Sequence, residues 1–222
     1  MRRQKVKPIL QVALDVDDLF KALSLSTRIV AELGCGNIWM EAGTPLIKAW
    51  GRIGVDVLKK STNCFVVADT KTMDTGAFEG EIVLSAGADA YTVLGLADDS
   101  TIRESIDKAH EYNKLLIVDL INHPNPYKRA LELDRLGVDV VLYHVGIDVQ
   151  RSRGLTIDQL IDEIKMLKKN INAKIAVAGG IKHGKAKPLV DAGADIVVVG
   201  SAITKADDPV ESAKRFMEEI LS

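Results

Sequence analysis

The stretch Ala192-Gly193-Ala194-Asp195-Ile196-Val197-Val198-Val199 occurs in this chain in three versions. Each has a glycine, a small or branched apolar residue, an aspartate and then a run of strand-forming residues; the other versions lie at 86–93 and 136–142. The glycine is typical of the position after a helix, where a left-handed backbone is needed. The runs lack polar alternation, which indicates parallel strands buried on both faces. The glycines stand about fifty residues apart, which leaves room for two strand–helix units each time.

Apolar runs along the whole chain predict eight strands separated by helices, at 8–14, 36–41, 64–69, 89–94, 115–120, 139–144, 174–178 and 196–200. Two helix starts are marked by Thr156-Ile157-Asp158-Gln159, a capping box, and by Asp208-Pro209, an N-cap followed by proline. Because no linker divides the chain, residues 1–222 are predicted to form a single (β/α)8 TIM barrel domain. An open flavodoxin-like or Rossmann sheet is the alternative, although no Gly-x-Gly-x-x-Gly follows the first strand.

The composition excludes several classes of protein. The net charge of −2 gives no electrostatic reason to expect a nucleic-acid or membrane partner. The basic start, 1–7, leads into a predicted strand and not into a secretory apolar segment, and no apolar run is long enough to span a bilayer. We interpret Cys35 and Cys64 as small core residues, which suits a reducing, cytoplasmic setting.

Charged residues gather where the predicted strands end. Asp69-Thr70-Lys71-Thr72-Met73-Asp74 follows the third apolar run, Asp15 ends the first, Glu41 the second and His144 the sixth. Strand five ends near Asp119, with Asn122 and His123 beyond it. In a barrel all carboxyl ends share one rim, where clustered carboxylates repel each other unless a cation lies among them. These residues therefore predict one active site.

The residue types at this rim indicate distinct roles. Glu41 and Asp69 offer hard oxygen ligands suited to Mg²⁺, with Mn²⁺ as a substitute. His144 is suited to move a proton near neutral pH. We expect His110 and His183 to be solvent-exposed and leave His123 open.

Small residues follow the last two predicted strands. Gly179-Gly180 and Gly200-Ser201 place backbone N–H groups where they could contact an anion, and the loops after strands seven and eight are the usual phosphate site of a TIM barrel. The alternative is a pair of tight turns.

These motifs resemble the orotidine-5′-monophosphate decarboxylase suprafamily over nearly the whole chain. The resemblance is carried by Ala13-Leu14-Asp15, Glu41–Leu46, Asp69–Gly76, His144–Asp148, Ala178–Ile181 and Val199–Thr204. Orotidylate decarboxylases have lysine where this chain has Glu41 and Ile-Pro where it has Thr75-Gly76. The Lys-Thr-Met-Asp version of the motif is similar to the 3-hexulose-6-phosphate synthase branch. The 3-keto-L-gulonate-6-phosphate decarboxylases are the alternative; they usually have an arginine shortly after the strand-six histidine, whereas here the nearest are Arg151 and Arg153.

The resemblance implies a metal-dependent lyase of the aldolase type. Its reaction would join formaldehyde to C1 of D-ribulose 5-phosphate, reversibly and through an enediolate, with Mg²⁺ on Glu41 and Asp69. Lys71 and His144 would be catalytic, and Asp15 and Asp74 would orient Lys71 and bind substrate hydroxyls. A barrel that binds a sugar phosphate without turnover is the alternative from another class.

The resemblance also implies a homodimer in which Asp74 reaches the partner's site. Apolar residues give this some independent support, because Met73 and Phe78 flank Asp74 in a predicted loop and aromatic residues are favoured in interface cores. Trp39, Met40 and Trp50 lie in the neighbouring unit, where they could equally fill gaps between helices and barrel.

Overall fold

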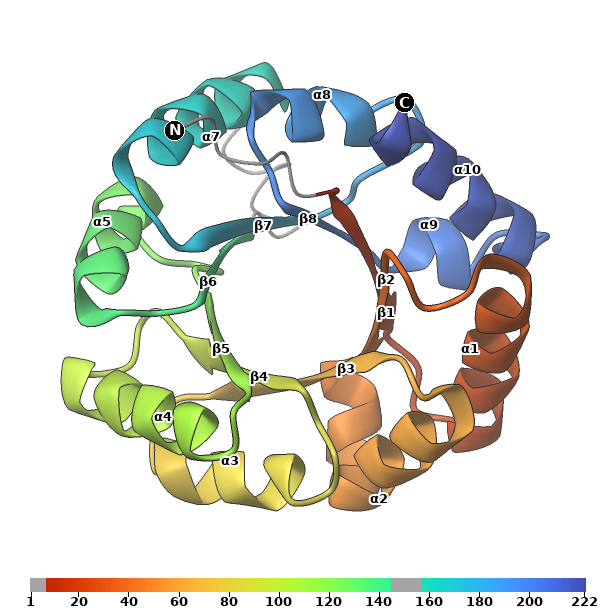
Figure 1. Cartoon of the computed structure of the whole chain (residues 1–222), viewed down its shortest axis with the longest axis horizontal. Coiled ribbons are helices and arrows are strands. Elements are labelled where there is room, and N and C mark those ends of the chain that lie inside the picture. The colour runs from red at the N-terminus through yellow and green to blue at the C-terminus, as the bar shows by residue number, and fades with distance from the viewer. Residues whose placement is uncertain (1–6, 145–156) are drawn as a thin grey trace.

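Eight parallel strands close into a barrel in the computed structural model, which describes residues 7–144 and 157–222, and helices surround them (Figure 1). The strands follow each other around the barrel in chain order: β1 (Ile9–Leu14), β2 (Ile38–Ala42), β3 (Phe65–Thr72), β4 (Ala90–Leu94), β5 (Leu115–Asp119), β6 (Val140–His144), β7 (Lys174–Ala178) and β8 (Ile196–Val199). Strand β1 pairs with both β2 and β8, so the barrel has no open edge. The predicted TIM barrel is confirmed, and the open-sheet alternative is wrong.

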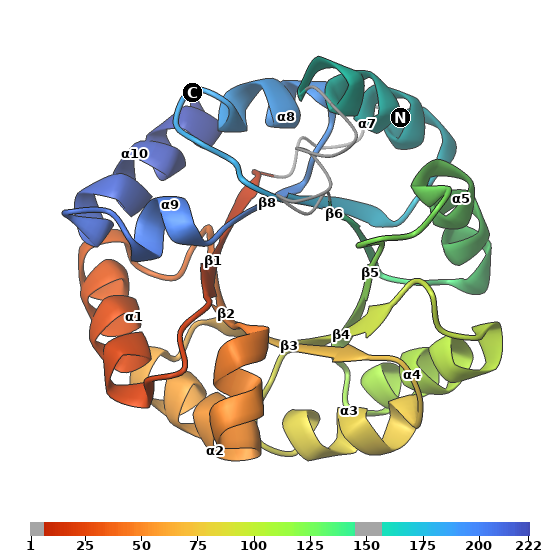
Figure 2. The same cartoon turned by 180° about the vertical axis from the view of Figure 1, so that it is seen from behind.

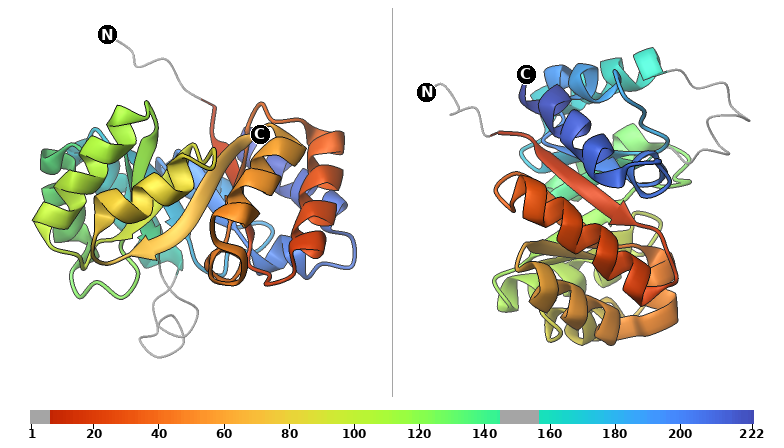
Figure 3. Two further views of the ribbon diagram at one scale, coloured as in Figure 1. Left: turned by 90° about the horizontal axis from the view of Figure 1, so that it is seen from below. Right: turned by 90° about the vertical axis from the view of Figure 1, so that its right-hand side faces the viewer.

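The helices form an outer ring and lie alongside the strands (Figures 2 and 3). They are α1 (Leu19–Leu33), α2 (Thr44–Thr62), α3 (Gly76–Leu84), α4 (Asp99–Glu111), α5 (Pro126–Leu136), α7 (Ile157–Asn170), α8 (Ala186–Ala192), α9 (Ser201–Thr204) and α10 (Pro209–Leu221). As predicted, Asp208 caps α10 by accepting hydrogen bonds from the N–H groups of Val210 and Glu211. No helix in the described part of the chain is both long and apolar enough to cross a membrane. The predicted capping box at Thr156 falls outside the described residues.

Side chains alternate along each strand between two apolar cores. The larger core packs the outward residues, such as Val12, Met40 and Val66, against the helices. The smaller core fills the barrel with inward residues, among them Ala13, Trp39, Val67, Ala90, Ile117, Val140, Leu142, Ala176 and Val198. Because side chains alternate with period two, the next inward positions toward the carboxyl ends are Asp15, Glu41, Asp69, Asp119 and His144. The strand pattern alone therefore directs the polar residues into the mouth of the barrel.

The aspartate of the repeated pattern holds the opposite end of the barrel together. Asp89, Asp139 and Asp195 each precede a strand and accept a 2.9 Å hydrogen bond from the backbone of a neighbouring strand, at Val66, Leu116 and Ile175. The preceding glycines have φ of 99°, 91° and 117°, as the pattern predicts. The repeat is thus structural: its glycine ends a helix, and its aspartate supplies an acceptor where a parallel ladder begins.

Several expectations from the sequence are wrong. Cys64 is a core residue as expected, but Cys35 is exposed, and the two form a disulfide between the segments that lead into β2 and β3, so neither is a reduced thiol. Trp39 and Met40 are core residues and not interface residues: Met40 packs between barrel and helices, which was the alternative reading, and the Trp39 ring stacks on Phe65 at 4.0 Å inside the barrel.

Two further corrections concern the segment around the Asp-x-Lys motif. Strand β3 does not end at Asp69 but runs to Thr72, with an irregular register against β4. Phe78 lies in α3 and not in a loop, although its side chain is 69% exposed.

Candidate active site

The mouth of the barrel brings together charged side chains from five strands or their ends. Asp15 follows β1, Glu41 lies on β2, Asp69 and Lys71 on β3, Asp119 ends β5 and His144 ends β6. The structure therefore assembles most of the predicted site, and it adds Asp119, to which the sequence assigned no role. Four predicted strand ends with an acidic residue were visible in the sequence, but which of these acids contacts Lys71 depends on how the barrel closes.

Lys71 is held between two carboxylates. Its Nζ lies 3.0 Å from an oxygen of Asp69 and 2.9 Å from Asp119 Oδ2. Burial works to lower the pKa of Lys71, but the two anions outweigh it and raise the pKa, so the amine stays charged. The backbone of Lys71 is left-handed, with φ of 47°, and its N–H donates to Thr92 Oγ1 at 2.9 Å. Such a conformation is costly for a non-glycine residue, and here it aims the amine inward.

Asp119 also orients His144. The carboxylate is fully buried, and its oxygens lie 3.1 and 3.2 Å from His144 Nδ1. Burial alone would raise the pKa of Asp119, but His144 and Lys71 together lower it, so the residue is an anion. An anion can only accept, so Nδ1 carries a proton toward Asp119, and Nε2 is the ring nitrogen left to take up or release one. His144 is thereby set up as a base through Nε2.

Glu41 is buried at the inner wall of the mouth and not at an open rim as expected, with only 6% of its surface exposed. It accepts a 2.7 Å hydrogen bond from Gln11 Nε2. Burial, with Asp69 and Asp15 nearby, raises the pKa of Glu41 well above its ordinary value. Asp69 is better satisfied, since it accepts from Thr44 Oγ1 at 2.6 Å and Thr92 Oγ1 at 2.8 Å as well as from Lys71.

Asp15 stands between two glycines at the mouth. A Cβ on Gly43 would lie 2.4 Å from Asp15 Oδ1, and one on Gly200 would lie 2.9 Å from Oδ2. Burial first, then Asp69, raises the pKa of Asp15, although its side chain reaches solvent. Glycine is required at 43 for this close approach, and Asp15 thus connects the acidic side of the mouth with the loop after β8.

The donor set fits a divalent cation. The carboxylates of Asp15, Glu41 and Asp69 lie near the amine of Lys71. The same amine also contacts a fourth carboxylate, that of Asp119. Burial first, and then the neighbouring carboxylates, raise the pKa values of Glu41 and Asp15, and a bound cation would offset the charge of this group. Gln11 Oε1, beside Glu41, is a further buried oxygen that has no donor in the described part of the chain.

This is not a preformed cage. No group of three His, Cys, Asp or Glu side chains within 7–144 and 157–222 is arranged to hold a metal. Carboxylates from Glu41 and Asp69 would have to be completed by water or substrate oxygens, which is how Mg²⁺ is usually held.

The two predicted phosphate turns lie on neighbouring strands. Gly179 and Gly180 follow β7 with φ of 115° and 60°, and Gly200 and the exposed Ser201 follow β8, where Ser201 begins α9. Strands β7 and β8 are paired, so the two turns are adjacent at the mouth. Their role in binding phosphate stays a prediction.

Asp74 is not part of the site of its own chain. Its exposed carboxylate accepts from the N–H of Thr75 at 2.8 Å, and the amine of Lys71 is instead oriented by Asp69 and Asp119. That Asp74 reaches the Lys71 of a partner chain stays a prediction.

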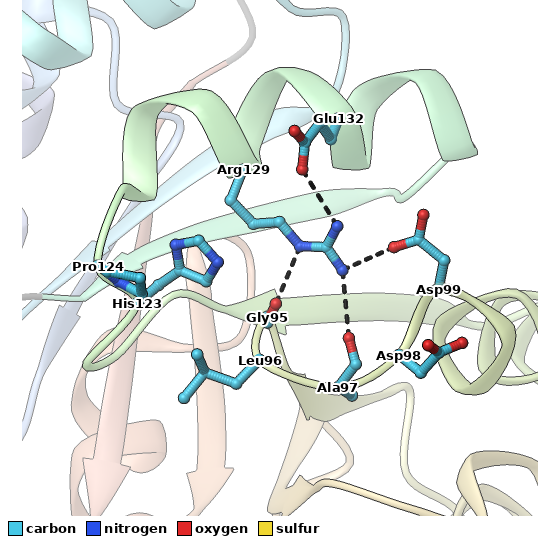
Figure 4. A pocket seen from close by; sticks show the side chains of 9 residues that line it. All are labelled: Gly95, Leu96, Ala97, Asp98, Asp99, His123, Pro124, Arg129 and Glu132. Carbon is cyan, nitrogen blue, oxygen red and sulfur yellow. Dashed lines mark hydrogen bonds and ion pairs between the residues drawn. The ribbon is translucent and has the colours of Figure 1, made fainter.

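The other histidines lie elsewhere. His123 lines a separate pocket of about 550 Å³ between the loops after β4 and β5 (Figure 4). Arg129 crosses this pocket and donates to the carbonyl oxygens of Gly95 and Ala97, which fixes the loop after β4.

His110 is half-exposed, as expected, and contacts Asp139. His183 is not a solvated loop residue but packs against α10. Arg151 and Arg153 lie outside the described residues.

Comparison with known proteins gives a consistent picture. Residues 8–216 match the model of the orotidine 5′-phosphate decarboxylase / HUMPS family. A 3-hexulose-6-phosphate synthase of Staphylococcus haemolyticus is 36% identical over 95% of this chain and 98% of its own length. The crystal structure of 3-hexulose-6-phosphate synthase from Salmonella typhimurium is 36% identical, with a TM-score of 0.86 over 97% of this chain and 99% of the other. That of 3-keto-L-gulonate-6-phosphate decarboxylase from Vibrio cholerae is 26% identical, with a TM-score of 0.83 over 97% and 98%.

Proposed function

Because the chain belongs to the orotidine 5′-phosphate decarboxylase / HUMPS family, we propose that it catalyses the 3-hexulose-6-phosphate synthase reaction. In this reaction formaldehyde adds to C1 of D-ribulose 5-phosphate, and D-arabino-hex-3-ulose 6-phosphate is formed reversibly. The observation that carries the proposal is the array in which buried Asp119 holds both the Lys71 amine and His144 Nδ1. A barrel that only bound a sugar phosphate would not need a histidine base and a lysine ammonium group that are both oriented by one carboxylate.

The chemistry follows from these three residues. His144 Nε2 takes a proton from C1, and Lys71 stabilises the negative charge that develops on the adjacent oxygen. Asp119 keeps both groups in place and stabilises the imidazolium that forms. C1 then bonds to the carbon of formaldehyde, and the former carbonyl oxygen of formaldehyde takes the proton back from His144. The proton count closes over the cycle.

The predicted metal complements this array. Glu41 and Asp69 would hold Mg²⁺, which when bound supplies Lewis-acid stabilisation of charge on the substrate's oxygens. Asp15 would accept from a substrate hydroxyl, and the turns at Gly179-Gly180 and Gly200-Ser201 would bind the phosphate through backbone N–H groups. Binding energy at the phosphate would then position C1.

The proposed assembly is a homodimer with shared sites. Asp74 is exposed beside Met73 and Phe78, which are 50% and 69% exposed, and Ile82 on the same helix as Phe78 is 37% exposed. A patch of large apolar side chains around a site residue is typical of an interaction surface. A two-fold partner would cover it and bring Asp74 to the neighbouring Lys71. A cytoplasmic location also stays a proposal, and the Cys35–Cys64 disulfide does not support it.

The direct test is consumption of formaldehyde by the purified protein with ribulose 5-phosphate, with Mg²⁺ and after removal of metal by a chelator. We expect turnover with Mg²⁺ only. The 3-keto-L-gulonate-6-phosphate decarboxylase structure makes decarboxylation of that substrate the second candidate, so release of CO₂ is measured in parallel. Decarboxylation without formaldehyde consumption would make the decarboxylase the preferred function. The absence of both activities would refute the proposed function.

A further inference from the structure

The loops after β7 and β8 are joined to each other through helix α10. Figure 1 and the view from behind in Figure 2 both place α10 beside α8 and α9. Three residues of α10, Ser212, Phe216 and Glu219, follow at spacings of four and three and therefore share one helix face. All three contact His183, which lies only three positions beyond Gly180 in the loop after β7.

His183 is held from three sides. Its ring stacks on the fully buried Phe216 with 4.0 Å between ring centroids. Its Nε2 lies 3.0 Å from Ser212 Oγ, and its Nδ1 lies 3.2 Å from Glu219 Oε1. The same Glu219 oxygen accepts from the N–H of Gly184 at 2.9 Å, so the loop is fixed through both a side chain and the backbone.

Ser212 continues the connection to the second loop. Its Oγ lies 2.8 Å from the carbonyl oxygen of Ala202, in α9 directly after Gly200-Ser201. A carbonyl oxygen can only accept, so the Ser212 hydroxyl donates to Ala202 and accepts a hydrogen bond from the N–H at His183 Nε2. One hydroxyl on α10 thus bridges the two loops.

Both ring nitrogens of His183 thus face α10, with Nε2 against Ser212 and Nδ1 against Glu219. Glu219 Oε2 is buried without a donor in the described part of the chain, so Glu219 contacts the loop through Oε1, at the ring of His183 and at the N–H of Gly184.

We propose that His183 is a positioning residue for the phosphate of the substrate: with Ser212 and Glu219 it forms a brace that sets the loops after β7 and β8 relative to each other. The inference rests on the proposed function, since it assumes that these two loops bind the sugar phosphate. His183 itself touches neither the reacting carbon nor the array of Lys71 and Asp119. Loosening the brace weakens binding of the phosphate and leaves the proton transfer intact.

The test is His183→Phe, which keeps a ring on Phe216 and removes both hydrogen bonds. We expect KM for ribulose 5-phosphate and the inhibition constant of inorganic phosphate each to rise about tenfold, with kcat changed by less than about twofold. Amide exchange should quicken at 179–184 and 200–204. Ser212→Ala, which removes only the hydroxyl, should move both constants in the same direction and serves as the second variant if His183→Phe does not fold.

The matched control is His110→Phe, which breaks another histidine–carboxylate contact, with Asp139, away from the mouth. It should leave KM and phosphate inhibition unchanged. The proposal is overturned if both brace variants keep wild-type KM and phosphate inhibition, or if they lower kcat as strongly as they raise KM. If the wild-type protein lacks the synthase activity, the proposed function fails by itself, and the brace is then judged from calorimetric binding of inorganic phosphate to the same variants.

Discussion

The substitution Asp119→Asn should disrupt the array of Lys71, His144 and Asp119 while the barrel still folds. Asp119 accepts from Lys71 Nζ at 2.9 Å, from His144 Nδ1 at 3.1 Å and from the N–H of Ile121 at 2.9 Å. An asparagine has one acceptor oxygen, so its amide group would point a donor at Lys71 or at His144. The ring of His144 is then no longer held in the tautomer that leaves the lone pair on Nε2.

The expected size of the effect follows from these contacts. Loss of one partner from a buried ion pair costs about 3–5 kcal/mol. The side chains of Lys71 and His144 are 27% and 20% exposed, and solvent screening reduces the expected loss to about 2–3 kcal/mol. Proton transfer by an oriented base is worth about 10²–10⁴-fold, so kcat should fall at least about 10²-fold. The assay is exchange of the C1 proton of ribulose 5-phosphate in deuterated water without formaldehyde, alongside urea unfolding.

Asp139→Asn is the matched control, because Asp139 also contacts a histidine and a backbone N–H, but at the opposite end of the barrel. It should cost stability and leave C1 exchange intact. Our reasoning about the array would be refuted if Asp119→Asn exchanged the C1 proton within about threefold of wild type.

Acid titration provides an independent check on Asp119. Its folded-state pKa lies below the ordinary value of 3.8, so its stabilising contribution is present above that value and is lost as pH falls through the lower folded pKa. The stability gap between wild type and Asp119→Asn should therefore be full at pH 7 and shrink below about pH 4. A gap that persists at low pH would mean that packing, and not charge, accounts for it.

Three further predictions concern the metal, the close approach at the mouth and the assembly. Glu41→Gln should raise the melting temperature of the metal-free protein at neutral pH, because the raised pKa of Glu41 means that its ionisation destabilises the fold. The same substitution should abolish the rise in melting temperature that Mg²⁺ causes in the wild type. An unchanged response to Mg²⁺ would show that Glu41 does not bind the metal. Gly43→Ala should lower kcat/KM by about tenfold or more while the circular dichroism stays native, because the new Cβ would lie 2.4 Å from Asp15 Oδ1; wild-type kinetics would show that Asp15 need not stay in place. Asp74→Ala and Lys71→Ala, each inactive alone, should recover about a quarter of wild-type activity when mixed, since half of the dimers are then mixed and each has one intact site; no recovery despite proven subunit exchange would argue against a shared site.

Much of the fold could be read from local pattern. Apolar runs were sufficient to place eight parallel strands, because strands buried on both faces are mostly apolar until they near their carboxyl ends. The same rule located Asp15, Glu41, Asp69 and His144 at one rim. Period-two alternation is a property of the chain itself and needs no knowledge of neighbours.

Partners across the barrel were beyond the reach of the sequence. Asp119 and Asp74 are both acids near a strand end, yet only Asp119 reaches Lys71, because closure brings β5 and β6 to face β3 while the turn after β3 carries Asp74 outward. The brace at His183 depends in the same way on where α10 packs. Sequence by itself determined which residues lie at the mouth; only the tertiary structure decided which of them touch, because contacts across a closed barrel join residues far apart in the chain, and their distances are set by closure and helix packing and not by any local period.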